Sequence, residues 1–195
     1  YLGNEVPFYL CRITRKIWLA GQVVYIVCAT AIYTVAILLS TILICGQRCY
    51  VGNIWSETAV KLAFTSAGKK LSLAASEKTL ELTRPYACMT TIFFLLFAYA
   101  LVMVLLIFWF RILWNELAGM IAGVVFNGIS FIFSPGILQK LLGISERKSY
   151  LANVAAGWIS PLSHATYHLH NFGYDRLPSL RDSGIYDMVL VIMLI

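Results

Sequence analysis

The chain has 195 residues, of which 60% are hydrophobic and only 12% are charged, with a mean hydropathy of +0.79. Because the surface of a soluble domain needs about 25% charged residues to stay hydrated, this composition excludes an ordinary water-soluble domain and indicates that lipid solvates much of the surface. The net charge of +6 favours an anionic membrane surface as partner over nucleic acid, since the charges are scattered and no basic tract is interleaved with aromatic residues.

The first predicted span covers residues 17–45, which include no Asp, Glu, Lys, Arg or His. As a helix these residues would extend roughly 43 Å, more than the hydrocarbon layer of about 30 Å. Just before this span lie Arg12, Arg15 and Lys16, and Trp18 fits an aromatic belt at the lipid headgroups. The basic segment is either a plain headgroup anchor, with about 1 kcal/mol for each cation near an anionic leaflet, or a contact site for a partner.

Residues 46–87 carry nine charges and are predicted to form one or two short helices. Cys45 and Cys49 lie four residues apart at the end of the first span. They could form a disulfide if that end faces an oxidising compartment, but the sequence favours free thiols.

The second and third predicted spans are the uncharged stretches 88–110 and 117–139. Only the six residues RILWNE separate them, so the two helices should form an antiparallel hairpin. Gly119, Gly123 and Gly128 place small residues on the third span, where the backbone of a neighbouring helix can approach closely.

Several polar residues interrupt the third span. The tripeptide Ser134-Pro135-Gly136 is predicted to kink or end the helix. Asn127, Ser130 and Ser134 need hydrogen-bond partners in lipid, so we expect them to face the interior of the bundle. They either bond one helix to another or line a path for a substrate.

Residues 140–185 are more polar than the spans and are predicted to form short helices at the membrane interface or between spans. The segment SHATYHLHN contains His164, His168 and His170. On a helix, His164 and His168 would share a face and could hold a metal ion, although Ala165 stands where a zinc protease has its Glu. The alternative is that these histidines hydrogen-bond to the backbone of the loop.

Residues 186–195 begin a further span, so the predicted fold is all-α: a polytopic transmembrane helical bundle with short interfacial helices, in a single domain over residues 1–195. The chain begins without Met and stops inside an apolar run, and we expect it to be a fragment. If the basic segment is cytoplasmic, that side holds four Lys and Arg residues and the other side eleven, the reverse of the usual positive-inside distribution.

The order of these features resembles the permease subunits of ABC-2 type transporters, particularly the small six-span exporter permeases of Gram-positive bacteria. A basic-aromatic segment, RITRKIWLAGQ, leads into a span and an outer loop. A tight helical hairpin follows, then an outer region containing ISPLSHATYHLHNFGY, then a last span. The resemblance covers nearly the whole chain and depends on layout and loose motifs; the lysines of the outer loop at 61–78 depart from the family topology.

The resemblance implies that the spans correspond to the third to sixth of six, with the first two missing upstream. It also implies that residues 8–18 are a coupling segment that docks on a separate ATPase subunit, and that residues 141–183 are an outer helical lid. The implied docking residues are Phe8, Tyr9, Arg12, Arg15, Lys16 and Trp18.

The expected function is therefore that of a non-catalytic, multi-pass permease subunit of an ATP-driven exporter in a bacterial plasma membrane. Its partners would be an ABC ATPase subunit, a second permease copy and membrane lipid, and this chain would bind no cofactor. Two alternatives come from other classes: a membrane-embedded metalloenzyme using His164, His168 and His170, and a non-transporting immunity or sensor subunit.

Overall fold

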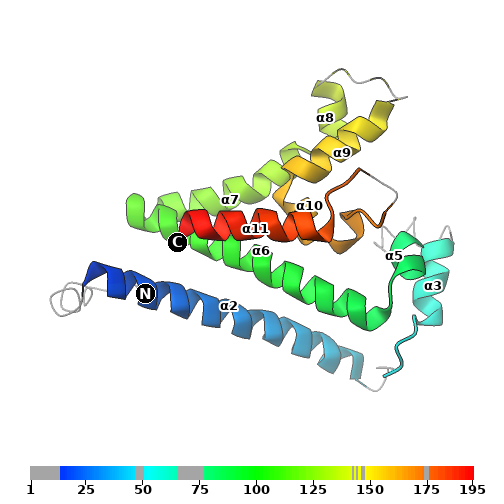
Figure 1. The fold of residues 1–195 in the computed structure, drawn as a ribbon, viewed down its shortest axis with the longest axis horizontal. Coiled ribbons are helices and arrows are strands. Elements are labelled where there is room, and N and C mark those ends of the chain that lie inside the picture. The colour runs from blue at the N-terminus through cyan, green and yellow to red at the C-terminus, as the bar shows by residue number, and fades with distance from the viewer. Residues whose placement is uncertain are drawn as a thin grey trace.

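The computed structural model describes residues 14–46, 51–65, 77–141, 143, 145, 148–173 and 176–195 (Figure 1). Within these ranges the regular structure is entirely helical. Two helices are long and apolar enough to cross a membrane: α2 (Arg15–Cys45) and α6 (Pro85–Leu113). A third candidate is a bent pair, α7 (Glu116–Ile132) with α8 (Pro135–Leu141).

Helix α6 is the centre of the molecule, because α2, α7 and α11 (Leu180–Leu194) each pack against it. The dense apolar sequence of α6 explains this position, and its Val102 and Leu105 side chains are each only 1% exposed. Pro85 occupies the first turn of α6, where its missing N–H removes no helical hydrogen bond.

The long helices alternate in direction, so the two ends of the bundle differ (Figure 1). The start of α2, the turn between α6 and α7, and the C-terminal end of α11 lie together at one end. The short helices gather at the other end: α3 (Glu57–Phe64), α5 (Glu77–Leu82), α8, α9 (Ser149–Ile159) and α10 (Pro161–Ala165). The basic start of α2 is therefore far from the histidine segment.

Helices α6 and α7 approach most closely at two glycines of α7. A Cβ atom at Gly119 would lie 2.7 Å from the Ile107 carbonyl oxygen, and one at Gly123 would lie 3.0 Å from the end of the Ile107 side chain. Gly128 differs, because a Cβ atom there would meet no atom within 4 Å. Gly128 is therefore not a point of close helix approach.

The third predicted span is not one straight helix. The axes of α7 and α8 meet at 71°, and the break falls at Ser134 and Pro135. Helix α7 alone has 17 residues, or roughly 25 Å, which is shorter than the hydrocarbon layer of about 30 Å. Proline cannot donate the backbone hydrogen bond that would continue the helix, and this explains the bend within residues 117–139.

Helix α2 packs on α6 through a narrow stripe, Ile26, Thr30 and Thr34. The two threonine hydroxyls donate to the carbonyl oxygens of Ile26 and Thr30, one turn earlier. Most other large apolar side chains of α2 are exposed, including Ile32 at 71% and Leu43 at 78%. An apolar helix with so little burial is suited to a lipid surrounding.

Candidate functional site

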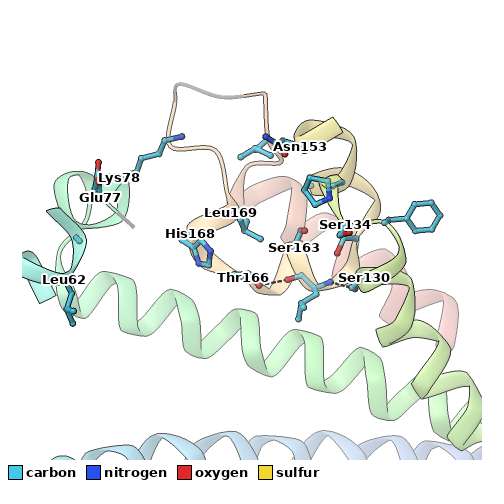
Figure 2. Close-up of a pocket in the computed structure, with 18 residues that line it drawn as sticks. Leu62, Glu77, Lys78, Ser130, Ser134, Asn153, Ser163, Thr166, His168 and Leu169 are labelled. Carbon is cyan, nitrogen blue, oxygen red and sulfur yellow. Dashed lines mark hydrogen bonds between the residues drawn. The ribbon is translucent and has the colours of Figure 1, made fainter. Parts of the chain in front are cut away.

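A pocket of about 730 Å³ lies at the end of the bundle where the short helices gather (Figure 2). The break between α7 and α8 forms one wall, and α9, α10 and the following segment form others. Glu77 and Lys78 of α5 add charged groups to the lining. The uncharged polar side chains of the lining include Ser130, Ser134, Asn153, Ser163, Thr166 and His168.

Two of the three polar residues predicted for the third span line this pocket. The Ser130 hydroxyl accepts a hydrogen bond of 3.1 Å from the Leu162 backbone N–H, which fixes the first turn of α10 against α7 (Figure 2). Ser134 lies at the helix break and its side chain is labelled beside the pocket in the same view. A bent helix thus brings hydroxyl groups to a cavity instead of burying them in a straight helix contact.

Asn127, the third of these polar residues, bonds one helix to another. The Tyr99 hydroxyl of α6 donates to Asn127 Oδ1 at 2.5 Å, and Asn127 Nδ2 donates to the Gly123 carbonyl at 3.3 Å. Asn127 therefore bonds α6 to α7 and does not line the pocket.

Behind the pocket, His164 and His170 share one buried hydroxyl. Ser183 Oγ of α11 lies 2.8 Å from His164 Nδ1 and 2.8 Å from His170 Nε2. Both imidazoles are 1% exposed and Ser183 is fully buried. The Tyr186 ring stacks on His164 with 4.2 Å between ring centroids. This cluster, His164–Ser183–His170, joins α10 and the segment after it to α11.

The hydrogen atoms of this cluster can be counted. His170 Nδ1 lies 2.9 Å from the Thr166 carbonyl and His164 Nε2 lies 3.2 Å from the Trp158 carbonyl, so both nitrogens need a hydrogen to make these bonds. Ser183 has one hydroxyl hydrogen for two ring nitrogens, so one of those nitrogens needs a hydrogen as well. The complete network therefore requires one more proton than two neutral imidazoles carry.

Burial acts against that extra proton. Desolvation lowers the pKa of His164 and of His170 below the usual 6.5, while the backbone carbonyls of Trp158, Tyr167 and Thr166 oppose the shift. The pKa of His168 is lowered by burial and then by repulsion from His170. At neutral pH both imidazoles of the cluster are thus neutral, and one of the four contacts lacks a hydrogen.

The free energy of unfolding should therefore fall as the pH is lowered from 7.5 through 6.5. The unfolded histidines bind protons near their usual pKa of 6.5, whereas the folded ones bind them only at lower pH, so acid favours the unfolded state until the folded pKa is passed. Unfolding by SDS in mixed micelles at pH 7.5, 6.5 and 5.5 measures this. Subtracting the profile of the double variant His164→Gln/His170→Gln removes the contribution of the carboxyl groups. If stability rose on acidification, completing the network would outweigh burial and this prediction would be wrong.

The three histidines do not form the metal site considered from the sequence. Helix α10 ends at Ala165, and His168 belongs to a separate 3-10 turn, Tyr167–Leu169, so His164 and His168 do not share a helix face. His168 lines the pocket, while the other two imidazoles bond to Ser183. Within the described ranges no group of three His, Cys, Asp or Glu side chains is arranged to hold a metal ion.

Sequence reasoning missed a buried carboxylate in α11. Asp187 is 6% exposed, and its Oδ2 atom has no hydrogen-bond partner in the described part of the chain. The signal was present, because Asp187 is the single charge in the apolar run IYDMVLVIMLI. An ionisable residue in such a run indicates a functional position.

The docking residues implied by the family resemblance fall in two groups. Phe8, Tyr9 and Arg12 lie outside the described residues. Arg15 and Lys16 form the exposed first turn of α2, and Trp18 is half-buried one turn further on. Cys45 ends α2, and Cys49, its candidate disulfide partner, also lies outside the described residues.

The positions of the basic and polar features can now be combined. The start of α2 lies at one end of the bundle and the short helices lie at the other (Figure 1). The exposed cations Arg15 and Lys16 belong to the first of these ends, and the pocket lining belongs to the second. Comparisons with protein-family models, with curated proteins and with solved structures found no match for this chain.

Proposed function

We propose that this chain is the membrane-spanning permease subunit of an ATP-binding-cassette exporter, with ATP hydrolysed by a separate partner subunit. In this proposal the chain crosses a bacterial plasma membrane several times, works with a second permease copy and performs no covalent chemistry itself. The proposed family rests on the resemblance in layout, and the geometry of the pocket supports a transport role.

The observation that carries the proposal is the pocket at the break between α7 and α8. Its volume of about 730 Å³ lies in the range of ligand sites, about 300–1,000 Å³. Broken helices line substrate sites in many transporters, because a break exposes polar groups at membrane depth where they bind a ligand. Ser130 and Ser134 are the hydroxyl groups that the break between α7 and α8 brings to the pocket.

The other end of the bundle supplies a surface for a motor protein. Arg15 and Lys16 are exposed at the first turn of α2, and Arg111 with Glu116 (3.4 Å between their charged atoms) lies at the α6–α7 turn of the same end. In the proposed arrangement, the cations at this end pair with acidic residues of the ATPase. The pocket at the far end binds the substrate. A sensor or immunity subunit would need no ATPase at this surface.

The proposal is tested by purifying the tagged chain in mild detergent from cells that naturally produce it and measuring co-purified ATP hydrolysis. We expect a vanadate-sensitive ATPase, and we expect its amount to fall by more than about tenfold in the double variant Arg15→Glu/Lys16→Glu, because like charges placed across an interface cost several kcal/mol. The matched control is Lys140→Glu, a charge reversal at the exposed end of α8, which should leave the amount unchanged.

Two results would contradict the proposal. One is the absence of any co-purified ATPase from a chain that is stable and correctly inserted; this would favour the immunity or sensor alternative. The other is an equal loss of the ATPase in Lys140→Glu and in the double variant, which would mean that the basic end of α2 has no specific role in docking.

A further inference from the structure

A second cavity, distinct from the polar pocket, runs along the flank of the bundle between α6 and α11. This α6–α11 groove has a volume of about 430 Å³, and Phe94, Phe97 and Leu101 of α6 face Gly184, Asp187 and Met188 of α11 across it. The α6 residues that line it fall between 91 and 101, within the uncharged stretch 88–110. The groove is therefore at the level of the membrane-spanning part of α6.

The lining of the groove is apolar except at two side chains. The Thr91 hydroxyl already donates to the Ala87 carbonyl of its own helix at 2.8 Å. Asp187 is the other: the residue is only 6% exposed, and its Oδ2 atom has no hydrogen-bond partner among the described residues. No Lys, Arg or His lines the groove in the described part of the chain.

A carboxylate in this position calls for a positive partner. Removing a charged group from water is unfavourable by several kcal/mol unless an opposite charge or hydrogen bonds compensate it. Among the described residues the lining supplies no such cation, so a bound cation would compensate the charge of this carboxylate. A hydrated metal ion does not fit, because it needs several oxygen ligands and the groove has one carboxylate.

The remaining features of the groove define the kind of cation. Phe94 and Phe97 bring aromatic rings to the same wall, and aromatic faces attract cations that have lost their water. The volume fits a drug-sized molecule, and the apolar lining favours hydrocarbon groups. We propose that the α6–α11 groove binds hydrophobic organic cations, with Asp187 as their counter-ion. Binding at this groove is a property of the chain itself and does not depend on an ATPase partner.

The test compares two ions of the same shape and opposite charge, tetraphenylphosphonium and tetraphenylborate. Their binding to the purified full chain in neutral maltoside micelles is measured by isothermal titration calorimetry, with empty micelles as the blank. We expect the chain to bind the cation in preference to the anion. The variant Asp187→Asn keeps the shape of the side chain and removes its charge, so its affinity for the cation should fall about tenfold or more, with no fall for the anion.

A second variant tests the groove without changing a charge. A Cβ atom at Gly184 would meet no atom within 4 Å, so Gly184→Leu should fold normally and fill the groove. It should weaken binding of the cation as strongly as Asp187→Asn does. The matched charge control is Glu116→Gln at the start of α7, outside the groove, where the acid is exposed; this variant should bind the cation as the unmodified chain does. Circular dichroism and gel filtration of each variant check the fold.

Three outcomes would overturn the proposal: equal affinity of the unmodified chain for the two ions, unchanged binding of the cation in Asp187→Asn, or unchanged binding in Gly184→Leu. If Asp187→Asn does not fold, the Gly184→Leu result decides alone. Failure of this test leaves the ATPase co-purification result untouched, since the two experiments use different ends of the molecule and different ligands.

Discussion

Replacing Gly119 with alanine should lower the free energy of unfolding by about 1–3 kcal/mol, the range found when a packed site is overfilled. The added Cβ atom would lie 2.7 Å from the carbonyl oxygen of Ile107 and 3.4 Å from the Cβ atom of Arg111. A backbone oxygen cannot rotate away as a side chain can, so α6 and α7 must move apart along the contact that holds the hairpin together. Unfolding by SDS in mixed micelles measures the change.

The same helix provides a graded set of controls. A Cβ atom at Gly123 would meet the ends of two flexible side chains, Ile107 at 3.0 Å and Met103 at 3.8 Å, so Gly123→Ala should cost less than Gly119→Ala. A Cβ atom at Gly128 would meet no atom within 4 Å. Replacing a helical glycine with alanine stabilises a helix by up to about 1 kcal/mol, so Gly128→Ala should be as stable as the unmodified chain or slightly more stable. Equal destabilisation by all three would show that α6 and α7 do not approach at Gly119.

The long helices were predictable from sequence because lipid solvation imposes a simple rule on composition. A stretch without charge and longer than the hydrocarbon layer must form a helix that satisfies its own backbone, and residues 88–110 lie within α6 for this reason. The bend near Ser134 follows from local chemistry as well, since a proline fixes it. The size of the bend depends on the helix that α8 packs against, which is α9. The sequence around Ser134 does not predict this contact.

The histidine cluster shows where such reasoning ends. The spacing of His164 and His168 predicts a shared face only if one helix contains both, and Thr166 interrupts that helix. The partner of His164 is Ser183, which is 19 residues further along and reaches the cluster because the chain turns back between α10 and α11. A hydrogen bond of 3.0 Å from Asn171 N–H to the Pro178 carbonyl helps to close this return. The periodicity of the sequence does not predict a contact between residues that such a return of the chain brings together.

Asp187 was missed for a different reason. The sequence predicts that the final apolar run begins a span, but this pattern does not predict whether its single acid is buried. Asp187 is buried because α11 packs along α6, and this tertiary contact cannot be deduced from the local sequence. The rule that would have found it is general: an acid inside an apolar run needs a partner or a ligand.

Replacing Ser183 with alanine should lower the free energy of unfolding by about 1–3 kcal/mol, the cost of leaving one buried polar group without its partner, because at neutral pH the single hydroxyl hydrogen serves one of the two ring nitrogens. The hydroxyl lies 2.8 Å from each of two ring nitrogens, His164 Nδ1 and His170 Nε2. Both imidazoles are 1% exposed, so water does not replace the hydroxyl without a local opening of the packing. The loss should be visible as easier unfolding by SDS and as a lower thermal midpoint.

The matched control is Ser40→Ala in α2. Ser40 is exposed and its hydroxyl donates only to the Ile37 carbonyl of its own helix, at 2.8 Å, so this variant should stay within about 0.5 kcal/mol of the unmodified chain. The pH profile separates the hydrogen-bond network from simple packing. Without the hydroxyl, the two imidazoles need only the hydrogens that face the carbonyls of Trp158 and Thr166, which two neutral rings supply. Ser183→Ala should therefore lose stability on acidification at least as steeply as the unmodified chain, because no hydroxyl remains to accept the hydrogen of a protonated imidazole. A variant as stable as the unmodified chain at every pH would show that Ser183 does not join the two histidines.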